Sequence, residues 1–400
     1  MGQLRYLPFR LAAVVAGGLM VALAGCGEDI DSPTAPDAGP ALATAAQALV
    51  FRQISAGYSH SCGVTTDDRA YCWGSGRLLG AGDAVSDSPR PVAVLGGLSF
   101  RQVSAGGIHT CGVTTDDRAY CWGDNVLGGL GDGTDRAHGT PAPVAGGLRF
   151  SLVRAGDGHT CGVTTGKIAY CWGGNAYGQL GDGTTFNRFA PVRVSGGLSF
   201  RQVVAGIYHT CGVTTGDKAY CWGGNVDGQL GTGNRVGSPV PAAVLGGHSF
   251  RQVSVGLVHS CGVTTSDQAY CWGDNDAGEL GDGTSSRRTR PAAVLGGIQF
   301  RFVDPGGQHT CGTTADNRAY CWGFNREGAL GDGTKTNRYG PVAVAGGLPF
   351  SQVDAGNRHT CGVTTDGVGY CWGYSGAGEL GDGTDQNQNR LRPTRVVAPI

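Results

Sequence analysis

The feature that most constrains the fold of this chain is a unit of 49 or 50 residues that occurs seven times between residues 51 and 397. Every copy contains the pattern H-[ST]-C-G-x-T-x-x-x-x-x-Y-C-W-G. The copies begin at Phe51, Phe100, Phe150, Phe200, Phe250, Phe300 and Phe350. A period this strict is typical of solenoids, propellers and arrays, in which each repeat is one supersecondary unit. Residues shared by all copies are expected to build the scaffold, since an active site needs to exist only once.

The shared motif predicts a β-hairpin whose two faces differ. If residues 66–68 form the loop, Cys62 lies directly opposite Cys72 on the neighbouring strand. Side chains alternate between the faces of a strand, so the two cysteines share one face and Tyr71 and Trp73 occupy the other. Stacked blades would place the bulky face of one unit on the small face of the next. Both faces are then buried, as in a radial propeller.

Two further segments of each unit are predicted to be strands. One is 91–94 and its equivalents after the hairpin, and the other is 100–103 and its equivalents before the next hairpin. The 74 glycines recur at fixed positions, many in Gly-Gly pairs that mark turns, so they do not indicate low complexity. Helical periodicity is essentially absent beyond the first 26 residues. The expected fold class is therefore all-β.

The first 26 residues have the organisation of an export signal. Arg5 and Arg10 give the positive charge that precedes the apolar stretch of a signal peptide. This stretch, residues 11–23, is too short to span a membrane as a helix. The sequence L-A-G-C at residues 23–26 resembles the bacterial lipobox, in which the cysteine is acylated and becomes the mature N-terminus. An ordinary signal peptide that happens to end near a cysteine is the alternative.

These features predict three parts of the chain. Residues 1–25 form a lipoprotein signal peptide, residues 26–49 a flexible tether after lipidated Cys26, and residues 50–400 a seven-repeat propeller. The protein is expected to be exported and lipid-anchored to a bacterial membrane, which it contacts through the N-terminal lipid alone. Because Gly27 and not Asp follows the cysteine, a Gram-negative host would place the protein in the outer membrane.

Apart from Cys26, the 15 cysteines form pairs that are ten residues apart. An exported chain meets an oxidising compartment, where an even set at fixed spacing favours disulfides. The expected bridges are Cys62–Cys72, Cys111–Cys121, Cys161–Cys171, Cys211–Cys221, Cys261–Cys271, Cys311–Cys321 and Cys361–Cys371. A metal site built from His60, Cys62 and Cys72 is the alternative, but structural zinc needs a fourth ligand and none recurs with the repeat. No metal and no cofactor are expected.

The repeat resembles that of the regulator of chromosome condensation (RCC1) family. The resemblance rests on H-T-C-G-V-T-T-x-x-x-A-Y-C-W-G-x-N-x-x-G-x-L-G-D-G-T, which residues 159–184 match almost throughout, and it covers all seven repeats. It implies a seven-bladed RCC1-type β-propeller. Rings of this family usually close by mixing strands from both chain ends, so residues 393–397 are expected to complete the first blade with residues 51–74. Repeat 6 departs from the pattern with Asp304-Pro305 in the usual Ser-Ala position.

The net charge and the expected export of the protein argue against two functions known for the family, nucleic-acid binding and nucleotide exchange on a nuclear GTPase. The formal net charge of −1 gives no electrostatic footprint for nucleic acid, so no nucleic-acid partner is expected. The namesake of the family is a nuclear exchange factor for a small GTPase that also binds chromatin, and an exported protein meets neither partner. Secreted bacterial relatives include a protein inhibitor of β-lactamase, which implies that a rim face can hold a protein. We therefore expect a monomeric binding module without catalysis, whose partner is an extracytoplasmic protein or an envelope polymer.

Specificity is expected where the seven copies differ, chiefly in the loops after the G-D-G-T motif. Pseudo-symmetry places these loops on one rim, where their basic and aromatic residues would form a binding face. Its candidate residues are Arg136, His138, Phe186, Arg188, Phe189, Arg235, Arg287, Arg288, Arg290, Arg338, Tyr339, Arg390 and Arg392. Solvated loops in which the G-D-G-T aspartates neutralise the arginines are the alternative. A second variable pair precedes each repeat histidine, as at Ile207-Tyr208.

Other functional signals are weaker. The repeat histidines, such as His159, recur identically and are expected to be hydrogen-bonded scaffold residues and not general bases. Residues 274–278 resemble a calcium loop only vaguely, because the glutamate at its twelfth position is absent. No catalytic residue is assigned. A polysaccharide-active hydrolase or lyase and a purely structural envelope protein are the alternative functions.

Overall fold

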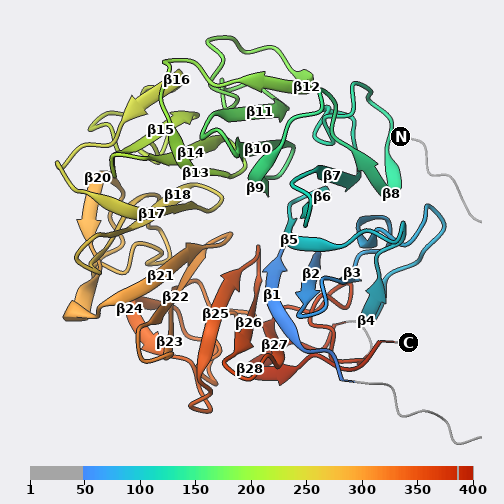
Figure 1. The fold of residues 1–400 in the computed structure, drawn as a ribbon. Coiled ribbons are helices and arrows are strands. Elements are labelled where there is room, and N and C mark those ends of the chain that lie inside the picture. Colours follow the sequence, from blue (N-terminus) through green and yellow to red (C-terminus); the bar gives the residue numbers. More distant parts are fainter. Residues whose placement is uncertain (1–47, 385–386, 400) are drawn as a thin grey trace, which may run out of the picture. The chain divides into compact units, whose positions relative to one another are not determined.

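The computed structural model describes residues 48–384 and 387–399, and these residues form a seven-bladed β-propeller (Figure 1). The chain divides into two units, Met1–Ala45 and Ala46–Ile400, and the propeller lies in the second. Each blade is a four-stranded antiparallel sheet whose strands follow one another in chain order. The predicted signal peptide, Cys26 and the tether up to residue 47 lie outside the described residues.

The strands of each blade are stacked outward from the propeller axis, and we number the blades in chain order. The innermost strands are β1 (Phe51–Ala56), β5 (Phe100–Ala105), β9 (Phe150–Ala155), β13 (Phe200–Ala205), β17 (Phe250–Val255), β21 (Phe300–Pro305) and β25 (Phe350–Ala355). The second strands are β2 (His60–Thr65), β6 (His109–Thr114), β10 (His159–Thr164), β14 (His209–Thr214), β18 (His259–Thr264), β22 (His309–Thr314) and β26 (His359–Thr364).

The third strand completes the predicted hairpin and the fourth lies at the periphery. The third strands are β3 (Ala70–Gly74), β7 (Ala119–Gly123), β11 (Ala169–Gly173), β15 (Ala219–Gly223), β19 (Ala269–Gly273), β23 (Ala319–Gly323) and β27 (Gly369–Gly373). The outer strands are β4 (Ser88–Ala93), β8 (His138–Pro143), β12 (Arg188–Arg193), β16 (Ser238–Ala243), β20 (Arg288–Ala293), β24 (Arg338–Ala343) and β28 (Arg390–Arg395). Two short 3-10 helices are η1 (Gly76–Leu79) and η2 (Leu295–Gly297).

The hairpin register follows the prediction from the repeat. In blade 1, Cys62 pairs with Cys72 and Ser61 with Trp73 across β2 and β3. The Cα atoms of Cys62 and Cys72 are 4.0 Å apart. All fourteen cysteines of the propeller lie in the seven predicted pairs, each bridged by a disulfide. The loop takes a left-handed residue at Asp68, a conformation that Asp and Asn tolerate better than most side chains.

The cysteine face of each blade packs against the aromatic face of the next. Between blades 3 and 4, Cys161 and Cys171 share one core cluster with Phe200 and Trp222. Trp222 is fully buried, and its indole N–H donates to the carbonyl of Gln179 at 3.0 Å. Equivalent clusters fill the other seams. The predicted packing of a bulky face on a small, disulfide-bearing face is therefore confirmed.

A buried hydrogen bond between side chains also joins each blade to the next. In the seam between blades 3 and 4, His159 Nε2 lies 2.9 Å from Thr210 Oγ1. The hydroxyl of Thr210 donates its own hydrogen to the carbonyl of Gln179, so it accepts from the histidine, which carries its proton on Nε2. The six other seams have the same histidine–hydroxyl contact. These histidines are therefore structural links, as the repeat predicts.

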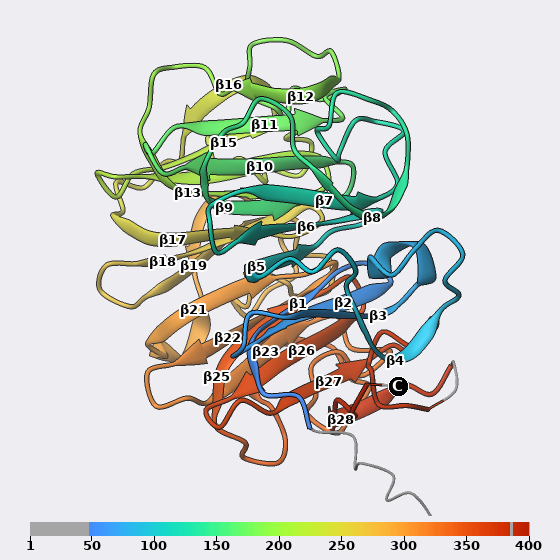
Figure 2. The ribbon, with the colours of Figure 1, turned by 45° about the vertical axis from the view of Figure 1, so that its right-hand side comes forward.

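The predicted closure of the ring by strand exchange is wrong. β28 pairs with β27 of the last blade, and β1–β4 form a complete sheet of their own. The chain starts with the innermost strand of repeat 1 and ends with the outer strand of repeat 7, so each copy supplies all four strands of one blade and no blade lacks a strand. The first and last blades instead meet through side chains and loops, and they lie side by side in both views of the ribbon (Figures 1 and 2). The Phe51 N–H donates to Gly367 O at 2.8 Å, and the Gly383 N–H donates to Pro89 O at 2.9 Å.

Antiparallel order gives the propeller two different faces. The turns between first and second strands and the long loops between third and fourth strands leave every blade at the same edge. We call this the loop face; in blade 4 it comprises residues 206–208 and 224–237. The opposite edge, the hairpin face, carries the hairpin loops and the connections between blades, residues 215–218 and 244–249 in blade 4. The chain enters the propeller at the hairpin face, because β1 begins there.

Candidate functional site

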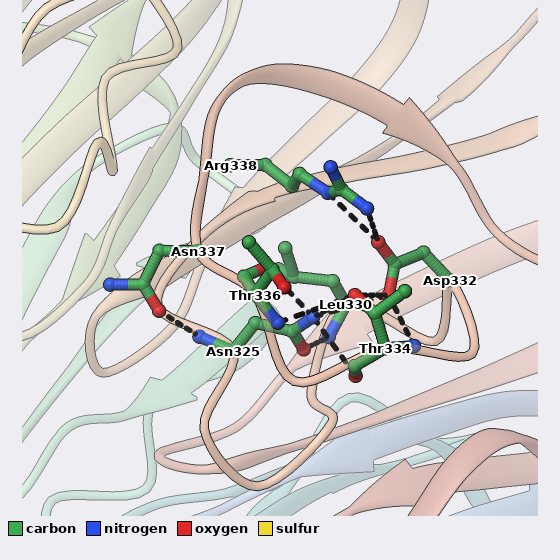
Figure 3. Close-up of polar contacts among 7 residues, drawn as sticks. All are labelled: Asn325, Leu330, Asp332, Thr334, Thr336, Asn337 and Arg338. Atoms are coloured by element: carbon green, nitrogen blue, oxygen red, sulfur yellow. Dashed lines mark hydrogen bonds and ion pairs between the residues drawn. The ribbon is translucent and has the colours of Figure 1, made fainter.

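The long loops of the loop face are held in shape by the asparagine of the repeat. In blade 6, Asn325 Oδ1 accepts from the Leu330 N–H at 3.0 Å, and Asn325 Nδ2 donates to Asp332 Oδ1 at 3.1 Å (Figure 3). The hydroxyl of Thr334 donates to the same oxygen of Asp332 at 2.7 Å. The G-D-G-T motif therefore builds a rigid loop in which the aspartate is a structural acceptor.

The arginine that begins the outer strand completes this arrangement. Arg338 donates from Nε and Nη2 to Asp332 Oδ2 at 2.9 and 2.8 Å (Figure 3). The side chain of Asp332 is only 3% exposed. Burial alone would raise the pKa of Asp332, but hydrogen bonds from Thr334 and Arg338 outweigh burial and hold the pKa below its ordinary value. The carboxylate is thus ionised and fully engaged by its own loop.

Four more of the predicted binding residues are engaged in the same way. Each pairs with the G-D-G-T aspartate of its own blade. The pairs are His138–Asp132, Arg188–Asp182, Arg288–Asp282 and Arg390–Asp382. Arg287 is held differently, by Asp227, Asp274 and Asp276. The arrangement matches the alternative in which aspartates neutralise the arginines, and it leaves little free positive charge for a basic ring.

The other predicted binding residues are spread over the periphery. Phe189 and Tyr339 lie on Gly128 and Gly278 of the preceding blade, and Arg290 and Arg392 lie on Gly233 and Gly333. A Cβ on Gly128 would come within 2.8 Å of the Phe189 ring, so these glycines make room for the outer strand of the next blade. Phe186, Arg136 and Arg235 are exposed, and neither arginine makes an ion pair within the described residues.

Exposed apolar side chains lie instead on the loop face of blades 2–4, and two of them meet across a seam between blades. We call Val126, Leu127, Tyr177, Tyr208 and Val226 the apolar patch; Val126, Tyr177 and Val226 are 64%, 52% and 69% exposed. The rings of Tyr177 and Tyr208 meet edge to face with their centroids 5.0 Å apart, although they come from neighbouring blades. Leu127 lies over Gly158 of blade 3, where a Cβ would come within 2.7 Å of Leu127 Cδ1.

Only one residue of the apolar patch, Tyr208, was predicted from the sequence as part of a variable surface. Tyr208 belongs to the variable pair before the repeat histidine, whereas the other four occupy the two positions after the motif asparagine. Those positions vary between blades as the post-G-D-G-T loops do, and this variation is the signal that could have identified them. In blade 6 the corresponding positions carry Arg326, Glu327 and Gln308, and in blade 7 Asn357 and Arg358 precede the histidine. Exposed apolar side chains at these positions are therefore characteristic of blades 2–4, whereas blade 6 carries charged ones.

The repeat histidines cannot act as surface acids or bases. Burial lowers the pKa of His159 to about 3 and that of His309 to about 4, because a charged imidazolium would lose its hydration. His159 is fully buried, and its Nδ1 has no hydrogen-bond partner among the described residues. These side chains are neutral at physiological pH and inaccessible to a substrate.

Residues 48–384 and 387–399 contain neither a metal-binding cluster nor a membrane-spanning helix. No group of His, Cys, Asp or Glu there is arranged to hold a metal ion. At the vague calcium motif, Asp274 and Asp276 are engaged by Arg287. None of the helices in this part of the chain is long and apolar enough to cross a membrane.

Comparison with known proteins agrees with the architecture. The family model of the RCC1-like domain matches residues 70–399, and that of the regulator of chromosome condensation (RCC1) repeat matches residues 51–78. No curated protein sequence matches the chain.

Similar solved structures come from several eukaryotes. Yeast RCC1 (Prp20), solved with Kap60 bound, is 19% identical with a TM-score of 0.74, over 91% of each chain. Human WBSCR16 is 20% identical with a TM-score of 0.71, over 79% of this chain and 87% of that chain. The ectodomain of the Arabidopsis thaliana receptor kinase ACR4 is 21% identical with a TM-score of 0.52, over 81% and 96%. At these identities the likeness concerns the fold. Because the domain model spans most of the chain, this protein belongs to the RCC1-like propeller family.

Proposed function

We propose that this protein is an exported, lipid-anchored propeller that binds another extracytoplasmic protein through the apolar patch, without catalysis. The observation that carries this proposal is the contact between the exposed rings of Tyr177 and Tyr208 across blades 3 and 4, with further exposed apolar side chains on the same face of blades 2 and 4. Adjacent exposed apolar side chains rimmed by polar residues mark interaction sites on soluble proteins. Tyrosine is among the residues that contribute most binding energy at protein interfaces.

A protein partner fits this surface better than a charged polymer does. The basic residues of the loop face are largely neutralised by aspartates, so they offer few free cations to an anionic glycan or phosphate polymer. Paired tyrosines supply large, rigid contact area with little conformational entropy to lose. The yeast relative, solved with Kap60 bound, supports a propeller of this fold engaging a protein.

The chain enters the propeller on the face opposite the apolar patch. The tether that would follow lipidated Cys26 leads into β1, whose first residue bonds to Gly367 in a hairpin loop of blade 7. The chain therefore joins the propeller at the hairpin face, opposite the apolar patch.

Export and lipidation have their own test. Labelled palmitate should be incorporated into the wild-type chain expressed in a bacterial host with lipoprotein-processing enzymes, and the Cys26→Ser variant should remain unlabelled and leave the membrane fraction. Labelling that persists in Cys26→Ser would contradict the assignment of the lipid to Cys26.

Binding is tested by quantitative co-purification from the native envelope. The variant Tyr177→Ser/Tyr208→Ser should lose the partner that the wild-type protein retains, whereas the control Leu95→Ser, at an exposed apolar residue of the hairpin face, should retain it. Loss of two interface tyrosines is expected to weaken binding by roughly 2–4 kcal/mol. Equal recovery of the same partner by both variants would overturn the proposal.

A further inference from the structure

The innermost strands enclose an axial cavity of about 550 Å³ that the proposed function does not use. At the hairpin-face end it is lined by Arg52, Arg101 and Arg301. At the other end it narrows to a ring of small residues that includes Ala56 and Ala105. Between these ends the wall is formed by the third and fifth residues of each innermost strand.

The residues that line this cavity differ between repeats, and several of the differences introduce charge. The fifth residue of the innermost strand is serine in blades 1, 2 and 5, but it is Arg154 in blade 3, Asp304 in blade 6 and Asp354 in blade 7. Blade 6 also has Phe302 at the third position, where five of the other blades have glutamine. At the fifth position the cavity wall therefore carries two carboxyl groups from neighbouring blades and one guanidinium from a blade that is not adjacent to either.

The hydrogen bond that each of these carboxyl groups makes to the next blade does not require a carboxyl group. Asp304 Oδ2 accepts from the Ala355 N–H at 2.9 Å, and Asp354 Oδ1 accepts from the Ala56 N–H at 2.7 Å. In blades 1 and 2 a serine hydroxyl accepts the equivalent N–H, as Ser55 does from Ala105 at 3.1 Å. A neutral serine thus suffices for the link between blades, and the two carboxyl groups need another explanation.

The two carboxylates and Arg154 influence one another without direct contact. Burial raises the pKa of Asp304 well above its ordinary value, and the neighbouring Asp354 raises it further. Burial also raises the pKa of Asp354, to about 6, while the charge of Arg154 lowers both. Yet the side chain of Arg154 makes no ion pair and no hydrogen bond with any described residue. The positive and negative groups are therefore separated by free space in the cavity.

We propose that the axial cavity binds a small zwitterion, whose ammonium group lies between Asp304 and Asp354 and whose carboxylate is held by Arg154. An ammonium has three donors and can bond to both carboxylates at once, and guanidinium matches a carboxylate with two parallel donors. The ring of Phe302 supplies an apolar contact beside the acidic pair. The chemical class is that of a free amino acid or a short peptide, and this inference does not rest on the proposed function.

A matched set of three probes tests the charge pattern by isothermal titration calorimetry on the intact propeller. L-leucine carries both charges, L-leucinamide only the cation and 4-methylpentanoate only the anion. L-leucine should bind, and the two single-charge probes should bind at least about tenfold more weakly, because each lacks one charge-assisted hydrogen-bonding group. Absence of L-leucine binding at millimolar concentration, or equal binding of all three probes, would overturn the proposal.

Variants locate the site. Asp304→Ser and Asp354→Ser introduce the residue that other blades use, so the link between blades is retained, and Arg154→Gln removes the guanidinium. Each should weaken L-leucine binding about tenfold or more without lowering the melting temperature. Asp67→Asn, at an exposed hairpin loop, is the control and should leave binding unchanged. Unchanged binding in all three cavity variants would place any L-leucine site elsewhere and contradict the proposal.

Proton linkage gives a readout that a structural role alone would not produce. Binding of an ammonium favours ionised Asp304 and Asp354, so L-leucine should release protons, and its affinity should rise with pH between 5 and 7. Besides Arg154, the other charged side chains that line the cavity are Arg52, Arg101 and Arg301 at its hairpin-face end. Affinity that is independent of pH, with no difference in heat between buffers of different ionisation enthalpy, would contradict the assignment of the ammonium to this pair.

Discussion

His359 in the last blade and Ser61 in the first are joined by a hydrogen bond of 2.8 Å between His359 Nε2 and Ser61 Oγ. The same contact joins His209 to Ser260 between blades 4 and 5, also at 2.8 Å. In both seams the serine hydroxyl donates to a backbone carbonyl of the preceding blade, Glu379 or Gln229. The seam that closes the ring is therefore built like an internal seam, although no covalent connection crosses it.

Truncation of these two serines tests the equivalence. Ser61→Ala leaves a buried histidine N–H without an acceptor, which should lower the free energy of unfolding by about 1–3 kcal/mol. Ser260→Ala is the matched internal variant and should cost a similar amount. Urea denaturation followed by tryptophan fluorescence measures both. If Ser260→Ala lowers the free energy of unfolding and Ser61→Ala does not, the hydrogen bond in the closing seam does not stabilise the propeller as the internal one does.

Acid should destabilise the propeller through its buried histidines. The folded pKa of His60 is lowered to about 3 and that of His109 to about 4, below the ordinary value near 6.5 that applies after unfolding. The unfolded chain therefore binds more protons, so this stability is full above pH 6.5 and is lost as the pH falls toward 4.

Buried carboxyls act in the opposite sense. The pKa of Asp354 is raised to about 6 and that of Glu279 to about 7, both mainly by burial, so their ionisation disfavours the folded state as the pH rises. The seven histidines outnumber these groups, and we expect the free energy of unfolding to be lower at pH 5 than at pH 7.5, with proton uptake on unfolding. Stability that rises on acidification would contradict this balance.

Each disulfide should stabilise its own hairpin. Cys161 and Cys171 are ten residues apart, and closure of such a short loop is worth roughly 3 kcal/mol at most in the chain-entropy model. Cys161→Ala/Cys171→Ala should lower the melting temperature but leave a folded propeller, because the hydrogen bonds of β10 with β11 and the packing of Trp222 remain. Thermal unfolding under non-reducing conditions measures the change. An unaltered melting temperature would show that the bridge does not contribute.

Charge reversal distinguishes arginines of the scaffold from free surface arginines. Arg288→Glu would place a carboxylate beside the buried Asp282 and should lower stability by about 1–2 kcal/mol, an effect limited by solvent because Arg288 is 40% exposed. Arg290→Glu, two residues along β20 and without an ion pair among the described residues, should have little effect. Equal melting temperatures of the two variants would argue against a structural role for the Arg288–Asp282 pair.

Much of the fold was predictable because the repeat contains it seven times. The ten-residue spacing of Cys62 and Cys72 determines the hairpin register, and the alternation with Tyr71 and Trp73 predicts how blades pack. The ring closure was predicted wrongly because the prediction followed the strand exchange usual in the family. The position at which each repeat begins, at the innermost strand, already indicated that every repeat forms a whole blade. Since β1 starts at Phe51 and β28 ends at Arg395, the chain holds seven whole blades.

The candidate sites were less predictable because they form between repeats. Arg288 and Asp282 are only six residues apart, so their ion pair could be predicted from the local sequence, as one of the two alternatives for these loops. Tyr177 and Tyr208 become neighbours only when blade 3 packs on blade 4. Arg154, Asp304 and Asp354 meet only because the seven innermost strands surround one axis. Alignment of the repeats identifies the residues that differ between blades, but only the arrangement of the blades in the ring shows which of these residues lie close together.

Site-specific photo-cross-linking tests the proposed binding face most directly. A photoreactive amino acid in place of Val226 samples the apolar patch, and the same residue in place of Leu95 samples an exposed apolar position of the hairpin face. In cells that export the protein, the Val226 probe should give one defined protein adduct that is absent with the Leu95 probe and is lost when Tyr177→Ser/Tyr208→Ser is added. The same adducts from both probes, or an adduct at Val226 that survives the loss of both tyrosines, would contradict the account.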